Sequence, residues 1–141
     1  MQQIIRKTQR QPTECRCLVC RMQCRVPCLG TPADIRRLIE AGYKDRLAPT
    51  LWLAGMYAGQ IRFPVPMVQP ARGEDGWCAF FQNGLCELHE RGLKPTEGKL
   101  SYHTIRADNF DFSCSLAWNV AKTWLDESYA GDLEEILRAM S

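Results

Sequence analysis

The sequence predicts a small α+β fold that is mainly helical, with one β-hairpin and long irregular segments. Three observations predict it: helix-capping signals around residues 32–41, an Asn-Gly pair between the apolar runs of residues 77–90, and helical spacing of apolar residues near the C-terminus. With 141 residues, 45% of them hydrophobic, the chain can bury a modest core. We expect a basic N-terminal segment at residues 1–14 and a single cysteine-rich domain at residues 15–141.

The first helix is predicted over residues 32–41. Thr31 supplies an N-cap, Pro32 suits the first helical position, Asp34 suits the positive end of the helix dipole, and Gly42 follows the end. Its apolar residues share one face, which we expect to lie in the core: Ile35, Leu38 and Ile39.

A second, well-buried helix is predicted over residues 49–57, because this run has little polar surface. The residues that follow contain Pro64, Pro66 and Pro70, which exclude a central strand and allow an edge strand or a loop.

Two further helices are predicted in the C-terminal part of the chain. In residues 113–127 the apolar residues recur at the spacing of an amphipathic helix: Leu116, Ala117, Val120, Ala121, Trp124 and Leu125. A short helix then restarts at Gly131 and Asp132 and runs through Leu133, Ile136 and Leu137.

The distribution of charged and apolar residues limits the compartment and the partners that we expect. The first 25 residues carry six arginines or lysines against Glu14 alone, whereas the net charge of the whole chain is only +2, too low for a dedicated polyanion binder. No secretory apolar core opens the chain, and no run of about 18 apolar residues occurs. We therefore expect a cytoplasmic protein without a membrane partner. A reducing compartment favours metal-ligating or redox cysteines over disulfides, although secretion by another route would allow four bridges.

The hairpin around Asn83 and Gly84 has two candidate registers. A two-residue loop pairs Phe81 with Cys86 and sends Cys78 and Cys86 to opposite faces. A three-residue loop with a bulge at Gly84 places both thiols on one face, together with Phe80 and Leu88. We prefer the second register, because it lets both thiols approach one metal. The other interpretation of Cys78 and Cys86 is that they are small buried hydrophobic residues.

Two groups of closely spaced cysteines separated by a long insert are typical of a thiolate metal site. The first group follows the pattern Cys17-x2-Cys20-x3-Cys24-x3-Cys28, and the second is Cys78-x7-Cys86. We predict that these six cysteines are metal ligands and that the metal organises the fold. Six cysteines are more than one tetrahedral site needs. The cysteines of the first group could lie along one face of a helix or in an irregular turn.

The arginines between the cysteines support ionised thiols. Arg16, Arg21 and Arg25 would lower thiol pKa values and offset the negative charge of a tetrathiolate site, although each could also belong to a solvated basic turn. Zinc and an iron–sulfur cluster both accept four cysteines, so the cofactor stays open between the two.

The order of these features resembles the zinc- or iron-chelating domain family (YkgJ-like). The match rests on the cysteine-rich opening, the TPADIRRL helix and the stretch WCAFFQNGLCELHERGLKP, and it spans about residues 15–103. The resemblance implies metal ligation by Cys17, Cys20, Cys24, Cys78 and Cys86. Relatives of the family include proteins implicated in methyl transfer to protein lysines.

The chain departs from the family pattern at two places. Arg25 follows Cys24 where the family has an adjacent Cys-Cys pair, and Gly98 with Lys99 stands where the family has Cys-Arg. One ligand is therefore missing. Cys28 could replace the second cysteine of the missing pair. The ligand missing near Gly98 could be replaced by one of several other residues, each of which also has an ordinary structural interpretation: His103, His89, Cys15 and Cys114. For Cys114, at the start of an amphipathic helix, we expect packing.

We therefore expect a metal-binding domain whose biochemical role is open. One alternative is an iron–sulfur or zinc enzyme of redox or methyl-transfer type, with an open ligand position near Gly98. Another is a nucleic-acid-binding zinc module, suggested by the basic N-terminal segment. The spacing does not match the common Cys2His2 finger and the chain is only mildly basic, so we do not expect a nucleic-acid partner, while a protein partner stays open.

Overall fold

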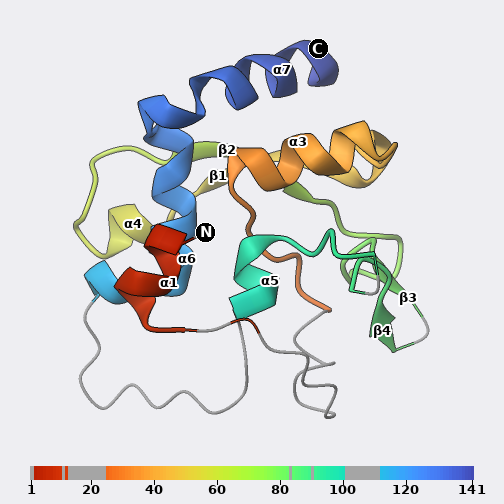
Figure 1. Ribbon diagram of the computed structural model, residues 1–141, viewed down its shortest axis with the longest axis horizontal. Helices are drawn as coiled ribbons and strands as arrows, with labels where there is room; N and C mark the ends of the chain where they lie inside the picture. Colours follow the sequence, from red (N-terminus) through yellow and green to blue (C-terminus); the bar gives the residue numbers. More distant parts are fainter. Residues whose placement is uncertain (1, 11, 13–24, 83, 90, 101–111) are drawn as a thin grey trace.

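The structure is a computed structural model that describes every residue except 1, 11, 13–24, 83, 90 and 101–111. It shows a small α+β fold (Figure 1). The helices are α1 (Gln2–Thr8), α3 (Pro32–Glu40), α4 (Ala54–Tyr57), α5 (Thr96–Leu100), α6 (Leu116–Ala121) and α7 (Ala130–Met140). The strands are β1 (Leu47–Trp52), β2 (Val65–Pro70), β3 (Phe81–Gln82) and β4 (Leu85–Cys86). Short 3-10 turns lie at Lys44–Arg46 (η1), Phe112–Cys114 (η2), Lys122–Leu125 (η3) and Glu127–Tyr129 (η4).

Helix α3 confirms the capping analysis. The Thr31 side chain accepts a hydrogen bond from the Asp34 N–H, the Asp34 carboxylate accepts one from the Thr31 N–H, and Pro32 opens the helix. After the helix, Gly42 has a φ of 94°, a left-handed conformation that favours glycine. The predicted inner face is buried at Ile35 and Leu38, both 0% exposed, so α3 is a core helix.

The predicted buried helix over residues 49–57 is wrong. Residues 47–52 form β1, which pairs antiparallel with β2, and only the four residues of α4 are helical. The apolar side chains of this region are also largely exposed, with Leu51 at 59% and Tyr57 at 85%. Apolar composition alone did not distinguish helix from strand, and pairing with β2 decided the outcome.

Three prolines lie in the β1–β2 ribbon without breaking it. Pro49 pairs with Val68, while Pro66 and Pro70 pair with Leu51 and Leu47. Hydrogen-bonded and non-hydrogen-bonded pairs alternate along an antiparallel ladder, and these three pairs are all of one type. A proline nitrogen cannot donate to the partner strand, so this type is the non-hydrogen-bonded one. Their nitrogens therefore face the two outer edges of the ribbon. This agrees with the expectation that the proline-rich segment can form only an edge strand.

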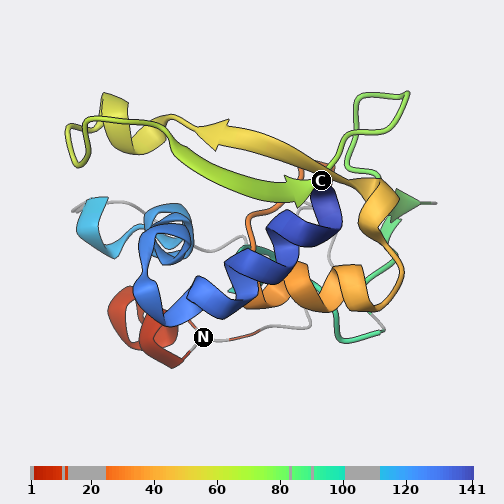
Figure 2. The same cartoon turned by 90° about the horizontal axis from the view of Figure 1, so that it is seen from above.

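Both C-terminal helices were predicted, and the second is longer than expected. Helix α6 begins at the Ser115 cap and tightens into η3 after Ala121. Helix α7 spans eleven residues, buries Ile136 and leaves Leu137 71% exposed. It crosses α3 (Figures 1 and 2), where Arg36 forms an ion pair with Asp132.

One hydrophobic core joins α3, the β1–β2 ribbon, the hairpin region and the C-terminal helices. Its most buried side chains are Ile35, Leu38, Val65, Phe80, Leu88, Leu100, Val120 and Ile136. Tyr43 meets Phe80 edge to face with ring centroids 5.4 Å apart. The first residues of the hairpin therefore belong to the same core as α3.

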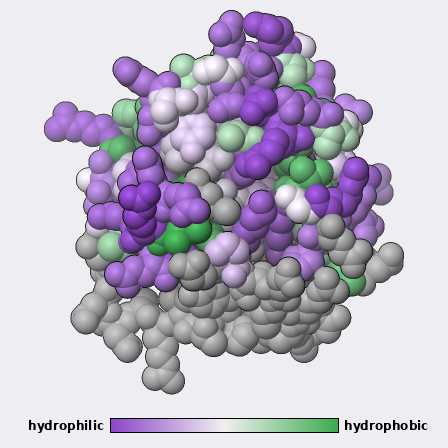
Figure 3. Space-filling view, in the orientation of Figure 1, coloured by the Kyte–Doolittle hydropathy of each residue, from purple (hydrophilic) through white to green (hydrophobic). Residues whose placement is uncertain are grey.

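The surface in Figure 3 is mainly hydrophilic wherever its residues are coloured. Across the part of the chain that the structure describes, no helix combines the length and apolar character needed to cross a bilayer.

Candidate metal centre

The structure describes three of the six predicted ligands. Cys78 is buried at 7% exposure, and Cys28 and Cys86 are partly buried. The other three, Cys17, Cys20 and Cys24, lie outside the described residues, as do Cys15, His103 and the interleaved Arg16 and Arg21. The site must therefore be judged from residues 25–28, the described end of the first cysteine group, and from their contacts with the second group.

A backbone hydrogen bond joins the two groups. The Cys78 N–H donates to the Arg25 carbonyl oxygen at 2.6 Å, and Arg25 directly follows Cys24 in the chain. The Arg25 guanidinium also stacks over the Trp77 ring, 4.6 Å from its centroid. Arg25, which lies between Cys24 and Cys28 of the first group, is thus directly alongside the buried Cys78.

Cys28 lies against Gly98. A Cβ atom added at Gly98 would lie 3.0 Å from the Cys28 Sγ. Two hydrogen bonds hold this arrangement: the Leu29 N–H donates to the Glu97 carboxylate at 2.9 Å, and the Glu97 N–H donates to the Leu29 carbonyl at 3.0 Å. The sulfur of Cys28 is therefore next to the place from which a side chain at position 98 would project.

The hairpin has the register that we did not prefer. Phe81 pairs with Cys86 and Gln82 with Leu85, which is the two-residue loop, and Gly84 has a φ of 80°. The preference for a three-residue loop is wrong. That preference assumed that Cys78 lies in the strand, whereas β3 begins only at Phe81. The Phe81 N–H donates to the Cys78 carbonyl in a turn, so the alternation of side chains along a strand does not set the direction of Cys78.

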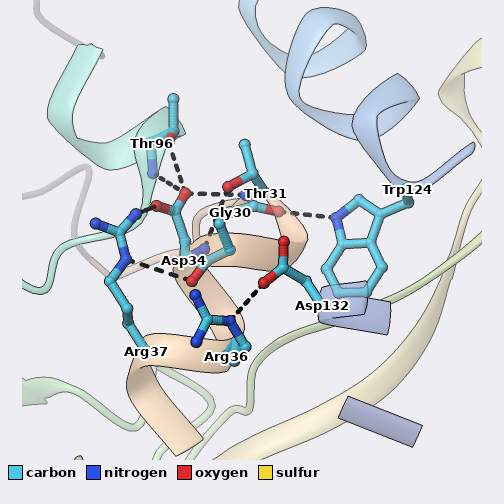
Figure 4. A network of polar contacts seen from close by, with 9 residues as sticks. Gly30, Thr31, Asp34, Arg36, Arg37, Thr96, Trp124 and Asp132 are labelled. Carbon is cyan, nitrogen blue, oxygen red and sulfur yellow. Dashed lines mark hydrogen bonds and ion pairs between the residues drawn. The ribbon is translucent and has the colours of Figure 1, made fainter. Parts of the chain in front are cut away.

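A buried carboxylate supports the segment that carries Cys28 (Figure 4). Asp34 is 5% exposed, and its Oδ2 accepts hydrogen bonds from the Thr31 N–H at 2.9 Å, the Thr96 N–H at 2.9 Å and the Thr96 hydroxyl at 2.6 Å. Trp124 fixes the same segment by donating its indole N–H to the Gly30 carbonyl at 2.8 Å. Asp34 thus connects the start of α3 to the start of α5, directly beside the Cys28–Gly98 contact.

Sequence reasoning missed two charged residues near this contact. The Lys94 stem packs on Gly98, with its Cε 2.9 Å from the Cβ position there. Burial raises the pKa of Glu97, while the Leu29 N–H and the positive charge of Arg10 oppose the rise. The Leu-Lys-Pro-Thr-Glu run preceding Gly98 gives no sequence signal for either role.

Glu97 makes stability depend on pH. Its folded pKa lies above the ordinary value of 4.5, so the folded chain holds the proton more tightly than the unfolded chain. Stability from this group is therefore greatest below 4.5 and falls as pH rises through the folded pKa. We expect Glu97→Gln, which keeps an acceptor for Leu29, to gain stability relative to wild type as pH rises through that window. Urea titrations at several pH values test this, and parallel pH curves for both proteins would contradict it.

Two of the substitutes proposed for the ligand missing near Gly98, Cys114 and His89, are among the described residues, and geometry supports neither. Cys114 is exposed, so the expected packing role is wrong, and its Sγ lies 3.9 Å from the Ser113 hydroxyl. His89 is half-buried at the end of the hairpin, where its N–H bonds the Cys86 carbonyl at 3.2 Å. Within the described residues alone, no three His, Cys, Asp or Glu side chains form a metal-ligating group.

Comparisons with protein-family models, with curated proteins and with solved structures find no match for this chain.

Proposed function

We propose that this chain is a thiolate metal-binding domain, similar in design to the zinc- or iron-chelating family that its sequence resembles. One observation carries the proposal: residues 25–28 connect the two cysteine groups, with a hydrogen bond to Cys78 at one end and the contact with Gly98 at the other. Cysteines far apart in sequence are thereby brought into one region without a shared strand or helix. A common metal is the simplest reason for such an arrangement.

The ligands would come from both groups. Cys17, Cys20 and Cys24 would supply the first, with Cys28 in place of the cysteine missing at position 98, and Cys78 and Cys86 would supply the second. A zinc ion or an iron–sulfur cluster would suit these sulfurs. Arg25, which follows Cys24 in the chain and stacks over the ring of Trp77, would help to offset the thiolate charge. A reducing compartment such as the cytoplasm would keep the thiols available.

The metal would mainly stabilise the fold. Structural zinc sites contribute on the order of 10 kcal/mol in small peptides. Here the hairpin strands are only two residues long, and long segments between Gly73 and Pro95 have no regular structure. A metal joining Cys78 and Cys86 to the first group would hold this region in addition to the core contacts of Phe80 and Leu88.

The test is the metal content of anaerobically purified protein, measured by elemental analysis for wild type and two serine variants. We expect stoichiometric zinc or iron in wild type, loss of that metal and a lower melting temperature in Cys78→Ser, and no change in Cys114→Ser. Cys114 is the matched control because its thiol is exposed and lies on η2. Wild-type protein without metal, or a Cys78→Ser variant that keeps it, would contradict the proposal.

A further inference from the structure

The end of the β1–β2 ribbon exposes an apolar tip, which we define as residues 51–63. From Leu47 to Ala71 the only charged residue is Arg62, although charged residues make up 24% of the whole chain. The large side chains of the tip are widely exposed: Leu51 59%, Leu53 43%, Met56 38%, Tyr57 85% and Phe63 50%. Figure 2 shows α4 at the end of the ribbon, away from α3. An exposed apolar cluster of this kind marks an interaction site.

The tip is a preformed surface. Trp52 stacks on Trp118 of α6 with ring centroids 5.9 Å apart and an interplanar angle of 18°. Gly55 packs so closely that an added Cβ would lie 2.9 Å from the Trp52 ring and 3.2 Å from the Ile61 side chain. The inward side chains are thus fixed in the fold, which holds the outward ones in place. A rigid surface loses little conformational entropy on binding.

The ribbon edges are poor sites for adding a further strand. Pro49 on β1, and Pro66 and Pro70 on β2, turn nitrogens without hydrogen toward the two outer edges. A further strand would therefore miss one donor along β1 and two along β2. We therefore assign the interaction to the exposed side chains of the tip.

We propose that the tip binds the tip of a second copy of this chain. In a two-fold contact the same residues face each other, so a patch carrying several like charges would repel its own copy. A tip with Arg62 as its only charge avoids this repulsion. Its composition also matches protein interfaces, which are rich in aromatic residues, Met and Arg and poor in Lys, Glu and Asp.

Sedimentation equilibrium of the full chain, as purified, tests this inference. The double variant Leu51→Ser/Tyr57→Ser removes two of the most exposed tip side chains, and Leu137→Ser removes a 71% exposed leucine on α7 as a matched control. We expect the average mass of wild type to rise from one chain toward two with concentration. The double variant should need at least about tenfold more protein for the same association, whereas the control should behave as wild type.

Two results would overturn the proposal: a mass of one chain at every concentration, or self-association that the tip substitutions leave unchanged. In parallel, flotation with phosphatidylcholine and phosphatidylserine vesicles tests a lipid surface as the partner. Tip-dependent flotation of a protein that stays monomeric would also overturn it. Circular dichroism of the variants confirms that they fold, and the metal content measured above is independent of either result.

Discussion

Replacing Cys28 with serine is expected to weaken metal binding by more than about 100-fold. Loss of a residue that only supports a ligand typically weakens binding 10- to 100-fold, and loss of a ligand should exceed that. The reason for choosing Cys28 is its position: its sulfur lies beside Gly98, and the contact would let it serve in place of a side chain at position 98. Competition with a chromogenic chelator measures the change directly.

The same contact provides a rescue experiment. In the double variant Cys28→Ala/Gly98→Cys, alanine vacates the place of the Cys28 sulfur and the new Cβ lies 3.0 Å from it, so the new thiol can take over that place. Only the Lys94 side chain must move, and its end is flexible. We expect Gly98→Cys to restore most of the lost affinity and Lys99→Cys, one residue further along α5, to restore none. Unchanged affinity in Cys28→Ser, or failure of the rescue, would show that Cys28 is not a ligand.

Replacing Asp34 with alanine is expected to lower the free energy of unfolding by about 3–5 kcal/mol. The change leaves two buried N–H groups and the Thr96 hydroxyl without their acceptor, and each buried unsatisfied group costs about 1–3 kcal/mol. Because Arg37 is half-exposed, its ion pair with Asp34 adds little. Urea denaturation followed by circular dichroism gives the value.

Two further variants make the Asp34 prediction specific. Asp34→Asn keeps an oxygen for the Thr31 and Thr96 donors and should lose less than half as much stability as the alanine variant. Glu134→Ala, which removes an exposed ion pair with Arg138, should leave stability unchanged. A loss below about 1 kcal/mol in Asp34→Ala would show that this network does not support the segment carrying Cys28.

Helices α3, α6 and α7 were predictable because their signals are local, whereas α1 and α5 were not predicted. Thr31, Pro32 and Asp34 define the start of α3 through contacts within one turn, and Gly42 follows its end. The C-terminal helices were predictable for the same reason, since apolar spacing and the cap at Ser115 act within a few residues.

The strands were harder to predict because their partners are distant in sequence. Nothing within residues 49–57 reveals that β2 will pair with residues 47–52, and apolar residues were assigned to the core although Leu51 and Tyr57 face outward. The hairpin register was misassigned for another reason. It was chosen to bring Cys78 and Cys86 together, whereas the turn at Cys78 removes that residue from the ladder.

The sequence names candidate ligands, which stay a prediction, and does not give their geometry. Cysteine spacing pointed to Cys28 and Cys78, but the contact of Cys28 with Gly98 depends on the pairing of Leu29 with Glu97 far along the chain. The buried Asp34 network was also hidden, because the sequence shows Asp34 only as a capping residue and its bonds to Thr96 are tertiary.

The most direct measurement of the central claim is X-ray absorption at the zinc and iron edges of wild-type protein purified without oxygen. The proposal predicts one of these metals with four sulfur neighbours, at about 2.3 Å for zinc. A sample with neither metal, or a metal surrounded only by nitrogen and oxygen, would contradict the claim that the two cysteine groups bind a common centre.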